Sequence, residues 1–374
     1  MLHHLRRGSR WHWAFASVAS VVGTSAALLA PSATARFVPS LPRLGLTARM
    51  TPPEANAAAL PSPPAPATPR VIGPVSAELR AKGFNECFLP DPGPGAYLPY
   101  RPGPTGGRLF LPSEGGHTDD FGYDVIVHFH GAEPVRKALV QVSEGFVYLG
   151  IDLGIASGPY EKAYESPQAF AFLRAGIEKS LRQQAGDERA HIRHLALSAW
   201  SAGYGAVNAV LRHHAAGIDA VVLLDGLHAG FAADKPRTSL DSLTALHLAP
   251  TFAYAEAALR GEKIFFFSHS HVDPVDYAST ARTGELLLSM LGLEKTELPN
   301  ADTQNPFGLR AYVDQKGFHL RDYAGRNEHA HCAHTRYVEE PLVDILAPAW
   351  QTPQGSHTEE APAAEAPAPA ETSD

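Results

Sequence analysis

The chain has 374 residues and a formal net charge of −8, with 44% hydrophobic and 19% charged residues. This composition is ordinary for a globular protein with a core, and the acidic balance argues against a nucleic-acid binder, which would carry a basic surface. The two cysteines, Cys87 and Cys332, exclude a disulfide-dense scaffold and a four-cysteine zinc site; they leave open one bridge or two unpaired thiols.

Residues 1–35 have the features of an export signal. Arg6, Arg7 and Arg10 give a positive start, an uncharged alanine-rich run covers 13–30, and Ala33-Thr34-Ala35 is a small-residue cleavage site. We expect cleavage there, which predicts a secreted or periplasmic protein with no membrane segment after processing. The alternative is an uncleaved anchor helix, for which the apolar run is close to the minimum length.

Two segments are too rich in Pro and Ala to bury a core. Residues 36–74 predict an extended linker, and residues 351–374, which add Glu359, Glu360, Glu365 and Glu371, predict a disordered acidic tail. The folded part is therefore expected over 75–350, which is the size of one domain.

Strand and helix patterns alternate within the folded part. Strands are predicted at 123–129, 145–151, 192–198, 220–224, 263–268, 309–314 and 318–323, the last two around a Lys316-Gly317 turn. Helices are predicted at 166–184, with Ser166 as N-cap and Pro167 in the first turn, at 203–214, 279–291 and 335–346, and in part of 228–259.

The strand runs 221–224 and 264–267 are apolar without alternation, which is typical of parallel strands covered on both faces. The sequence therefore predicts an α/β fold with a doubly wound, mostly parallel sheet and helices on both faces. Functional groups of such sheets gather at the carboxyl ends of the strands.

The most specific local pattern is Ala199-Trp200-Ser201-Ala202-Gly203, where a predicted strand gives way to a helix. A nucleophilic hydroxyl on a tight strand-to-helix turn needs small neighbours, because backbone segments come close there. The usual G-x-S-x-G pattern has Ala199 in its first position here. Ser198 is the competing serine, but it lies inside the strand pattern, and a serine helix cap is the alternative reading of the motif.

This segment resembles the nucleophile elbow of the α/β-hydrolase superfamily, and His128-Phe129-His130-Gly131-Ala132 resembles its oxyanion loop. The resemblance extends over about 109–350 and concerns the superfamily only. It implies Ser201 as nucleophile and an oxyanion hole built from backbone amides near Gly131 or Ala132 and of Ala202.

The resemblance also implies a histidine base late in the chain. His329, His331 and His334 follow strand 318–323, and we choose His331, which lies nearest the final helix while still in the loop. His329 and His334 remain alternatives.

Two aspartates fit the superfamily's order of serine, acid and histidine. Asp225 directly follows strand 220–224, and Asp273 follows strand 263–268 at a greater distance, before Pro274. We favour Asp225 as the orienting acid, with Asp273 as the alternative and Asp276 as a distant third.

The sequence thus predicts an exported serine hydrolase of acyl bonds, most simply a carboxylic ester hydrolase that acts on a small-molecule or polymer-borne ester and needs no cofactor or metal. His130, Trp200, His228 and His269, together with His271, are expected to line the substrate site. One alternative is a metal-dependent hydrolase that uses the pairs His128/His130 and His269/His271. The other is a non-catalytic binding protein on the same fold.

Overall fold

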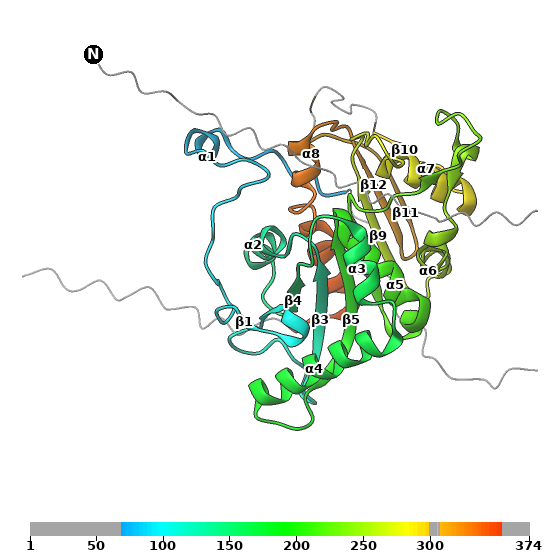
Figure 1. Ribbon diagram of the computed structural model, residues 1–374. Coiled ribbons are helices and arrows are strands. Elements are labelled where there is room, and N and C mark those ends of the chain that lie inside the picture. Colours follow the sequence, from blue (N-terminus) through cyan, green and yellow to red (C-terminus); the bar gives the residue numbers. More distant parts are fainter. Residues whose placement is uncertain (1–68, 299–304, 306, 354–374) are drawn as a thin grey trace, which may run out of the picture. The chain divides into compact units, whose positions relative to one another are not determined.

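A computed structural model describes residues 69–298, 305 and 307–353. The predicted signal (1–35), most of the predicted linker and the tail from 354 onward lie outside the described residues. The described part contains a ten-stranded sheet with the strand order β1-β2-β4-β3-β5-β6-β9-β12-β11-β10 (Figure 1). Its strands are β1 (Arg101–Pro102), β2 (Arg108–Phe110), β3 (Gly122–Phe129), β4 (Val147–Ile151), β5 (His191–Trp200), β6 (Ala220–Leu224), β9 (Ile264–His269), β10 (Thr296–Glu297), β11 (Leu309–Gln315) and β12 (Phe318–Tyr323). A separate small hairpin pairs β7 (Gly230–Phe231) with β8 (Leu243–Thr244).

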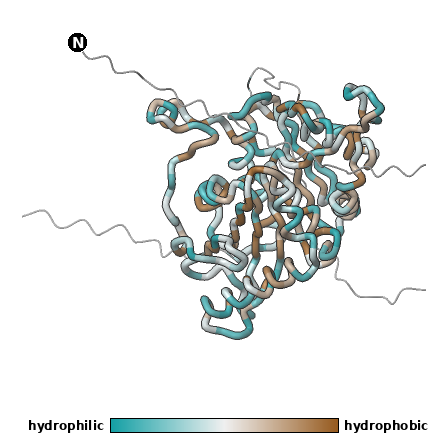
Figure 2. Tube along the Cα trace, in the orientation of Figure 1, coloured by the Kyte–Doolittle hydropathy of each residue, from teal (hydrophilic) through white to brown (hydrophobic). Residues whose placement is uncertain are grey.

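The six central strands, β4, β3, β5, β6, β9 and β12, pair in parallel, and antiparallel strands flank them at both edges. Neighbouring side chains of a central strand enter opposite layers of the core: Val125 and Val127 belong to one hydrophobic cluster and Ile126 to the other. Because both faces are buried, these strands read as continuous apolar runs. Figure 2 shows this as hydrophobic colour along the central strands.

Helices cover both faces of the sheet. One face packs against α3 (Ser157–Ala163), α4 (Pro167–Ala185), α5 (Tyr204–His214), α6 (Ala249–Arg260) and α7 (Thr280–Leu291). The other packs against α2 (Ala132–Val142), the π-helical segment η6 (Pro341–Leu346) and α9 (Ala347–Trp350). Two short helices, α1 (Ala77–Ala81) and α8 (Glu328–Ala333), contribute no residue to either of these two hydrophobic clusters. Short 3₁₀ turns connect the larger elements: η1 (Pro104–Gly106), η2 (Ser201–Gly203), η3 (Ala215–Gly217), η4 (Leu240–Ser242) and η5 (Leu246–Leu248). The predicted doubly wound, mostly parallel sheet with helices on both faces is confirmed.

The predicted helix at 335–346 is present but begins about four residues later than predicted and is π-helical over Pro341–Leu346. The chain first forms α8 at 328–333 and turns through His334 to Val338 before it continues as η6 and α9. Fully buried His334 and Thr335 hold the turn inside the protein, and Pro341 lacks the amide that a continuous helix would need. As a result His329 and His331 lie on a helix and not in a loop.

The N-terminal described segment crosses the molecule to the C-terminal part. Arg70 makes a bidentate ion pair with Asp344, at 2.7 and 2.8 Å, and Ile72 is buried beside Tyr337. A disulfide joins Cys87 to Cys332 across 245 positions of the sequence. Residues 69–74, placed in the linker by composition, thus contact the folded domain.

The membrane prediction concerns residues that the structure leaves undescribed. In the described residues, no helix has both the length and the apolar character that a membrane crossing requires.

Candidate active site

Ser201 directly follows β5 and begins the turn η2 that leads into α5. Its φ is +48°, in the left-handed region that non-glycine residues rarely occupy, and the residue is half-buried. His130 after β3 and Asp225 after β6 have positive φ as well, at +68° and +45°. Such backbone strain concentrates at functional sites, where the surrounding structure maintains it.

Two glycines permit the tight approach of backbone segments around Ser201. A Cβ on Gly203 would lie 2.0 Å from the carbonyl oxygen of Phe129, and one on Gly226 would lie 2.3 Å from the carbonyl oxygen of Ser201. Because real Cβ atoms do not approach so closely, both positions require glycine. The second contact also brings the turn after β6 against the turn after β5, so that Asp225 lies near Ser201.

Asp225 and His331 meet at this end of the sheet. His331 Nδ1 lies 2.6 Å from Asp225 Oδ2; the imidazole is 26% exposed and the carboxylate only 1%. With Nδ1 engaged by the carboxylate, Nε2 is the ring nitrogen left for proton transfer. Trp200, which precedes Ser201, donates its indole N–H to the backbone oxygen of His331 at 3.0 Å, and the two rings lie 4.7 Å apart. These contacts place His331 beside the turn that begins at Ser201.

Two further residues, which the sequence analysis did not single out, hold the Asp225 carboxylate. The amide of Ser270 donates to Oδ1 at 2.8 Å, the hydroxyl of Ser270 donates to Oδ2 at 2.6 Å, and the hydroxyl of Thr280 donates to Oδ1. Burial raises the pKa of Asp225, but the neighbouring His334 and His331 and the Ser270 hydrogen bond outweigh it, so that the pKa lies well below its ordinary value. The carboxylate is therefore ionised and fixed in orientation. The sequence feature that could have indicated these two residues is their position: Ser270 directly follows β9, and Thr280 begins α7.

The alternative bases occupy different environments. The His329 side chain is 48% exposed, and its Nδ1 lies 3.7 Å from Glu86. His334 is fully buried, with Nδ1 2.8 Å from the Ser268 hydroxyl, and burial lowers its pKa to about 4. The alternative acids Asp273 and Asp276 are exposed in the loop after β9. Of these candidates, only Asp225 and His331 are brought into contact.

The segment predicted as the oxyanion loop runs from the end of β3, at Phe129, to the start of α2, at Ala132. Gly131 caps α2 with a φ of +71°, and a Cβ there would lie 2.6 Å from the ring of Trp200. The amide of Ala132 donates to Asp152 Oδ1 at 3.3 Å. Ala202 directly follows Ser201 in the first turn, where amides have no acceptor within the helix. Of these three amides, that of Ala132 is the one with a side-chain acceptor among the described residues, so Gly131 and Ala202 are the preferred pair of candidate donors.

The residues expected to line the substrate site have different neighbours. The His130 ring stacks on Trp200 at 5.1 Å and bonds to the Tyr160 hydroxyl at 2.9 Å. His228 lies next to Tyr204 and Tyr277 and bonds through Nδ1 to the oxygen of Ala278. His269 is buried beside Asp322.

The four histidines of the metal alternative do not converge. His128 is fully buried, bonding through Nδ1 to the Ser198 hydroxyl at 2.8 Å and through Nε2 to the oxygen of His130 at 2.7 Å, and burial lowers its pKa to about 3. The His130 ring turns away to Tyr160. Among the described residues, the one group with metal-ligating geometry joins His269 and His271 with Asp322.

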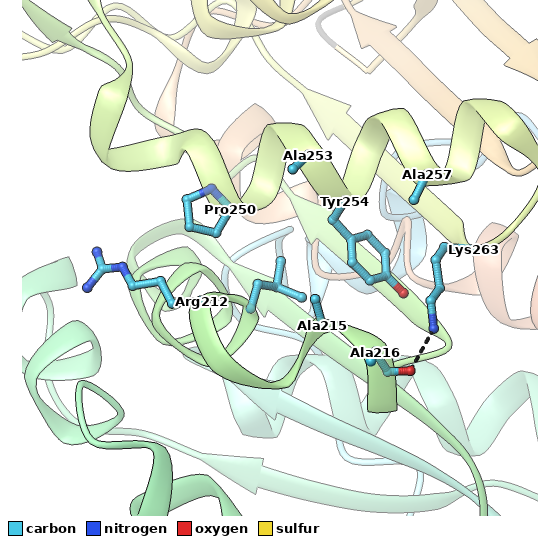
Figure 3. Close-up of a pocket in the computed structure, with 9 residues that line it drawn as sticks. Arg212, Ala215, Ala216, Pro250, Ala253, Tyr254, Ala257 and Lys263 are labelled. Carbon is cyan, nitrogen blue, oxygen red and sulfur yellow. Dashed lines mark hydrogen bonds between the residues drawn. The ribbon is translucent and has the colours of Figure 1, made fainter. Parts of the chain in front are cut away.

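A surface hollow of about 390 Å³ lies between α5 and α6 (Figure 3). Its lining includes Lys263, which precedes β9 and donates to the oxygen of Ala216, ahead of β6. It therefore lies at the amino ends of β6 and β9, opposite Asp225, and takes no part in the candidate active site.

No protein-family model matches the chain, and no curated protein sequence matches it. Among solved structures, it is similar to a serine-to-alanine mutant of the feruloyl esterase module from Clostridium thermocellum complexed with sinapinate (11% identity, TM-score 0.37, covering 77% of this chain and 96% of that one). It is also similar to the enterochelin esterase from Shigella flexneri (13% identity, TM-score 0.40, covering 70% and 60%) and to a ferulic acid esterase (17% identity, TM-score 0.36, covering 64% and 91%).

At these identities and TM-scores, the likenesses assign neither a role nor a substrate to this chain. The classification follows from the chain's own topology: six parallel strands, a serine on the tight turn after β5, and an aspartate and a histidine later in the chain at the same end of the sheet. The described residues thus have an α/β fold with the strand arrangement that the resemblance to α/β-hydrolases implies.

Proposed function

We propose that the protein is a serine hydrolase of acyl bonds, with carboxylic esters as its substrate class, that uses Ser201, His331 and Asp225. The observation that carries the proposal is the 2.6 Å contact between buried Asp225 and half-buried His331, next to a serine with a φ of +48°. A structural serine cap would need neither the strain nor the imidazole.

The chemistry follows from these positions. His331 Nε2 takes the proton of the Ser201 hydroxyl as the oxygen attacks the ester carbonyl, and Asp225 stabilises the imidazolium through Nδ1. The amides of Ala202 and Gly131 donate to the carbonyl oxygen as it becomes negative, which is worth about 3 kcal/mol per donor. The imidazolium then protonates the leaving alcohol, and water releases the acyl group from Ser201 by the reverse sequence.

We also propose that the protein acts outside the cytoplasm, in the periplasm or after secretion. The basic and apolar N-terminus supports this, and a disulfide such as Cys87–Cys332 persists where thiols are oxidised. The ester could be borne by a small molecule or by a polymer.

Labelling with a fluorophosphonate probe, combined with a panel of p-nitrophenyl esters, tests the proposal. Wild type should be labelled and active, and Ser201→Ala should lose labelling and at least about 10⁴-fold in kcat. Ser198→Ala is the matched serine control, because Ser198 is buried and bonds to His128, and it should retain labelling.

His331→Gln should lose activity as Ser201→Ala does, whereas His329→Gln, which changes an exposed histidine on the same helix, should keep it. Absence of labelling in folded wild type would favour a binding protein on this fold. Labelling that persists in Ser201→Ala would assign the nucleophile elsewhere.

A further inference from the structure

We infer that His269, His271 and Asp322 form a binding site for one divalent transition-metal ion of the Zn²⁺ class, separate from the proposed triad. Each residue offers one ligand atom, and the three atoms lie within 4.8 Å of one another. Two imidazoles and one carboxylate are a donor set that zinc accepts, with a fourth position left for water. The inference does not depend on the proposed hydrolase function.

The ligands stand at the ends of adjacent strands. His269 ends β9 and pairs in register with Asp322 near the end of β12. The amide of His271 donates to the oxygen of Gly325 at 2.7 Å, which ties the loop after β9 to the loop after β12. A metal site built on strand ends is held more precisely than one on free loops.

The distances between the three ligand atoms are close to those found around a coordinated ion. His271 Nε2 lies 2.7 Å and His269 Nδ1 3.9 Å from Asp322 Oδ1. Ligand atoms about 2.0–2.1 Å from a tetrahedral ion are roughly 3.4 Å from each other. Shifts of about half an ångström to one ångström would therefore complete the geometry, by the same comparison.

A second observation points to a missing ligand. The His269 side chain is only 1% exposed, and its Nδ1 has no hydrogen-bond partner among the described residues. Buried polar atoms are nearly always satisfied, and each exception calls for an explanation. A bound ion facing Nδ1 would satisfy it.

Two cations border the site and define its charge. Lys295 Nζ lies 2.6 Å from Asp322 Oδ2, which leaves Oδ1 directed at the histidines in the way that outer contacts orient metal ligands. Arg310 lies 3.2 Å from His271 Nε2, the same nitrogen that faces Asp322 Oδ1. One ring nitrogen cannot donate to a carboxylate and accept from a guanidinium together, so this arrangement is internally unsatisfied.

Arg310 is half-exposed and can turn outward, which makes it the side chain that an incoming ion would displace. This gives a specific expectation: Arg310→Gln should bind the ion more tightly, because it removes a like charge from the site.

The site also adjoins the proposed triad. Ser270 lies between the two histidine ligands, and its amide and hydroxyl both donate to Asp225. An ion bound to His269 and His271 would fix the loop that holds the carboxylate. Its role would be structural, with no ligand in contact with Ser201.

The test is Zn²⁺ binding to the tag-free full-length protein, measured by calorimetry and by metal content after dialysis, with the absorption spectrum of Co²⁺ as a geometric probe. Wild type should take up one equivalent with tetrahedral Co²⁺ bands and gain thermal stability. His269→Gln and Asp322→Asn should each weaken binding at least about 100-fold, and Arg310→Gln should tighten it about tenfold or more.

His329→Gln is the matched control, because His329 is an exposed histidine outside the site, and it should bind like wild type. Circular dichroism establishes that each variant is folded. No uptake by wild type would overturn the inference, and so would uptake that His269→Gln and Asp322→Asn leave unchanged, because the ion would then lie elsewhere.

Discussion

Removing the Cys87–Cys332 bridge should reduce both stability and turnover. The bridge closes a loop with a sequence separation of 245 residues. For a loop of that length, the chain-entropy expression gives about 5.5 kcal/mol of stabilisation, and measured values for disulfides are more often about 2–4 kcal/mol. We therefore expect the Cys87→Ser/Cys332→Ser double variant to lose about 2–5 kcal/mol in its free energy of unfolding.

Turnover should fall as well, because Cys332 follows His331 on α8, a helix of six residues. The bridge ties this helix to the N-terminal segment, where buried Glu86 lies beside His329. Without that tie, the imidazole is less well held against Asp225, and small losses of alignment cost large factors in rate. We expect kcat to fall with little change in KM.

The assay is urea unfolding together with p-nitrophenyl ester kinetics, for wild type with and without reductant and for the double variant. Arg70→Ala is the control: it removes a surface ion pair between the same N-terminal segment and Asp344, and it leaves the Cys87–Cys332 bridge intact. That change should cost about 0–1 kcal/mol and leave kcat unaltered. Equal stability and equal kcat in the oxidised and reduced proteins would refute the reasoning.

Three other predictions follow from single contacts. Asp225→Asn should lower kcat about 10⁴-fold, because the amide cannot hold the His331 tautomer, while circular dichroism establishes that the protein is folded; near-normal kcat would remove Asp225 from the proposed triad. Gly226→Ala should inactivate the protein, because the added Cβ would lie 2.3 Å from the backbone carbonyl oxygen of Ser201. Gly158→Ala, where the added Cβ meets open space, should remain active. An active Gly226→Ala would mean that the turn can shift to accept the Cβ. Asp124 is buried and accepts hydrogen bonds from His194 and Arg193, which outweigh burial and keep its pKa below the ordinary value. Its stabilisation is therefore full above the unfolded pKa and is lost as the pH falls through the folded one, so Asp124→Asn should cost about 3–5 kcal/mol at pH 7 and flatten the acid side of the stability profile; an unchanged acid limb would contradict this.

The sequence predicted the central strands and the capped helices well, because their signals are local. The strand at 220–224 has the predicted bounds, and Ser166 and Ser279 cap α4 and α7 through their hydroxyls. The helix α2 was not predicted. Its N-cap is Gly131, in a left-handed conformation, which offers no capping side chain, and Pro134 in its first turn gives no clear helix signal. The edge strand β2 has three residues, too few for a periodic pattern.

The site could be narrowed from the sequence but not completed. Superfamily order limited the base to three histidines and the acid to two principal aspartates, and long-range contacts separate them. His331 differs from His334 by facing Asp225 and not Ser268, two partners more than 60 residues away. Likewise, nothing local in the sequence indicates that Asp322 approaches His269 and His271, because that contact arises from the pairing of β9 with β12.

The covalent ring through Cys87 and Cys332 also determines what a break in the backbone would do. Residues 233–238, between β7 and β8, are exposed and include Arg237, a site for trypsin. A cut after Arg237 would leave Ser201 and Asp225 on one fragment and His331 on the other, yet the bridge would still join the fragments. The clipped protein would migrate as a single species until a reductant is added, and Ser201 and His331 would remain neighbours despite belonging to separate polypeptides.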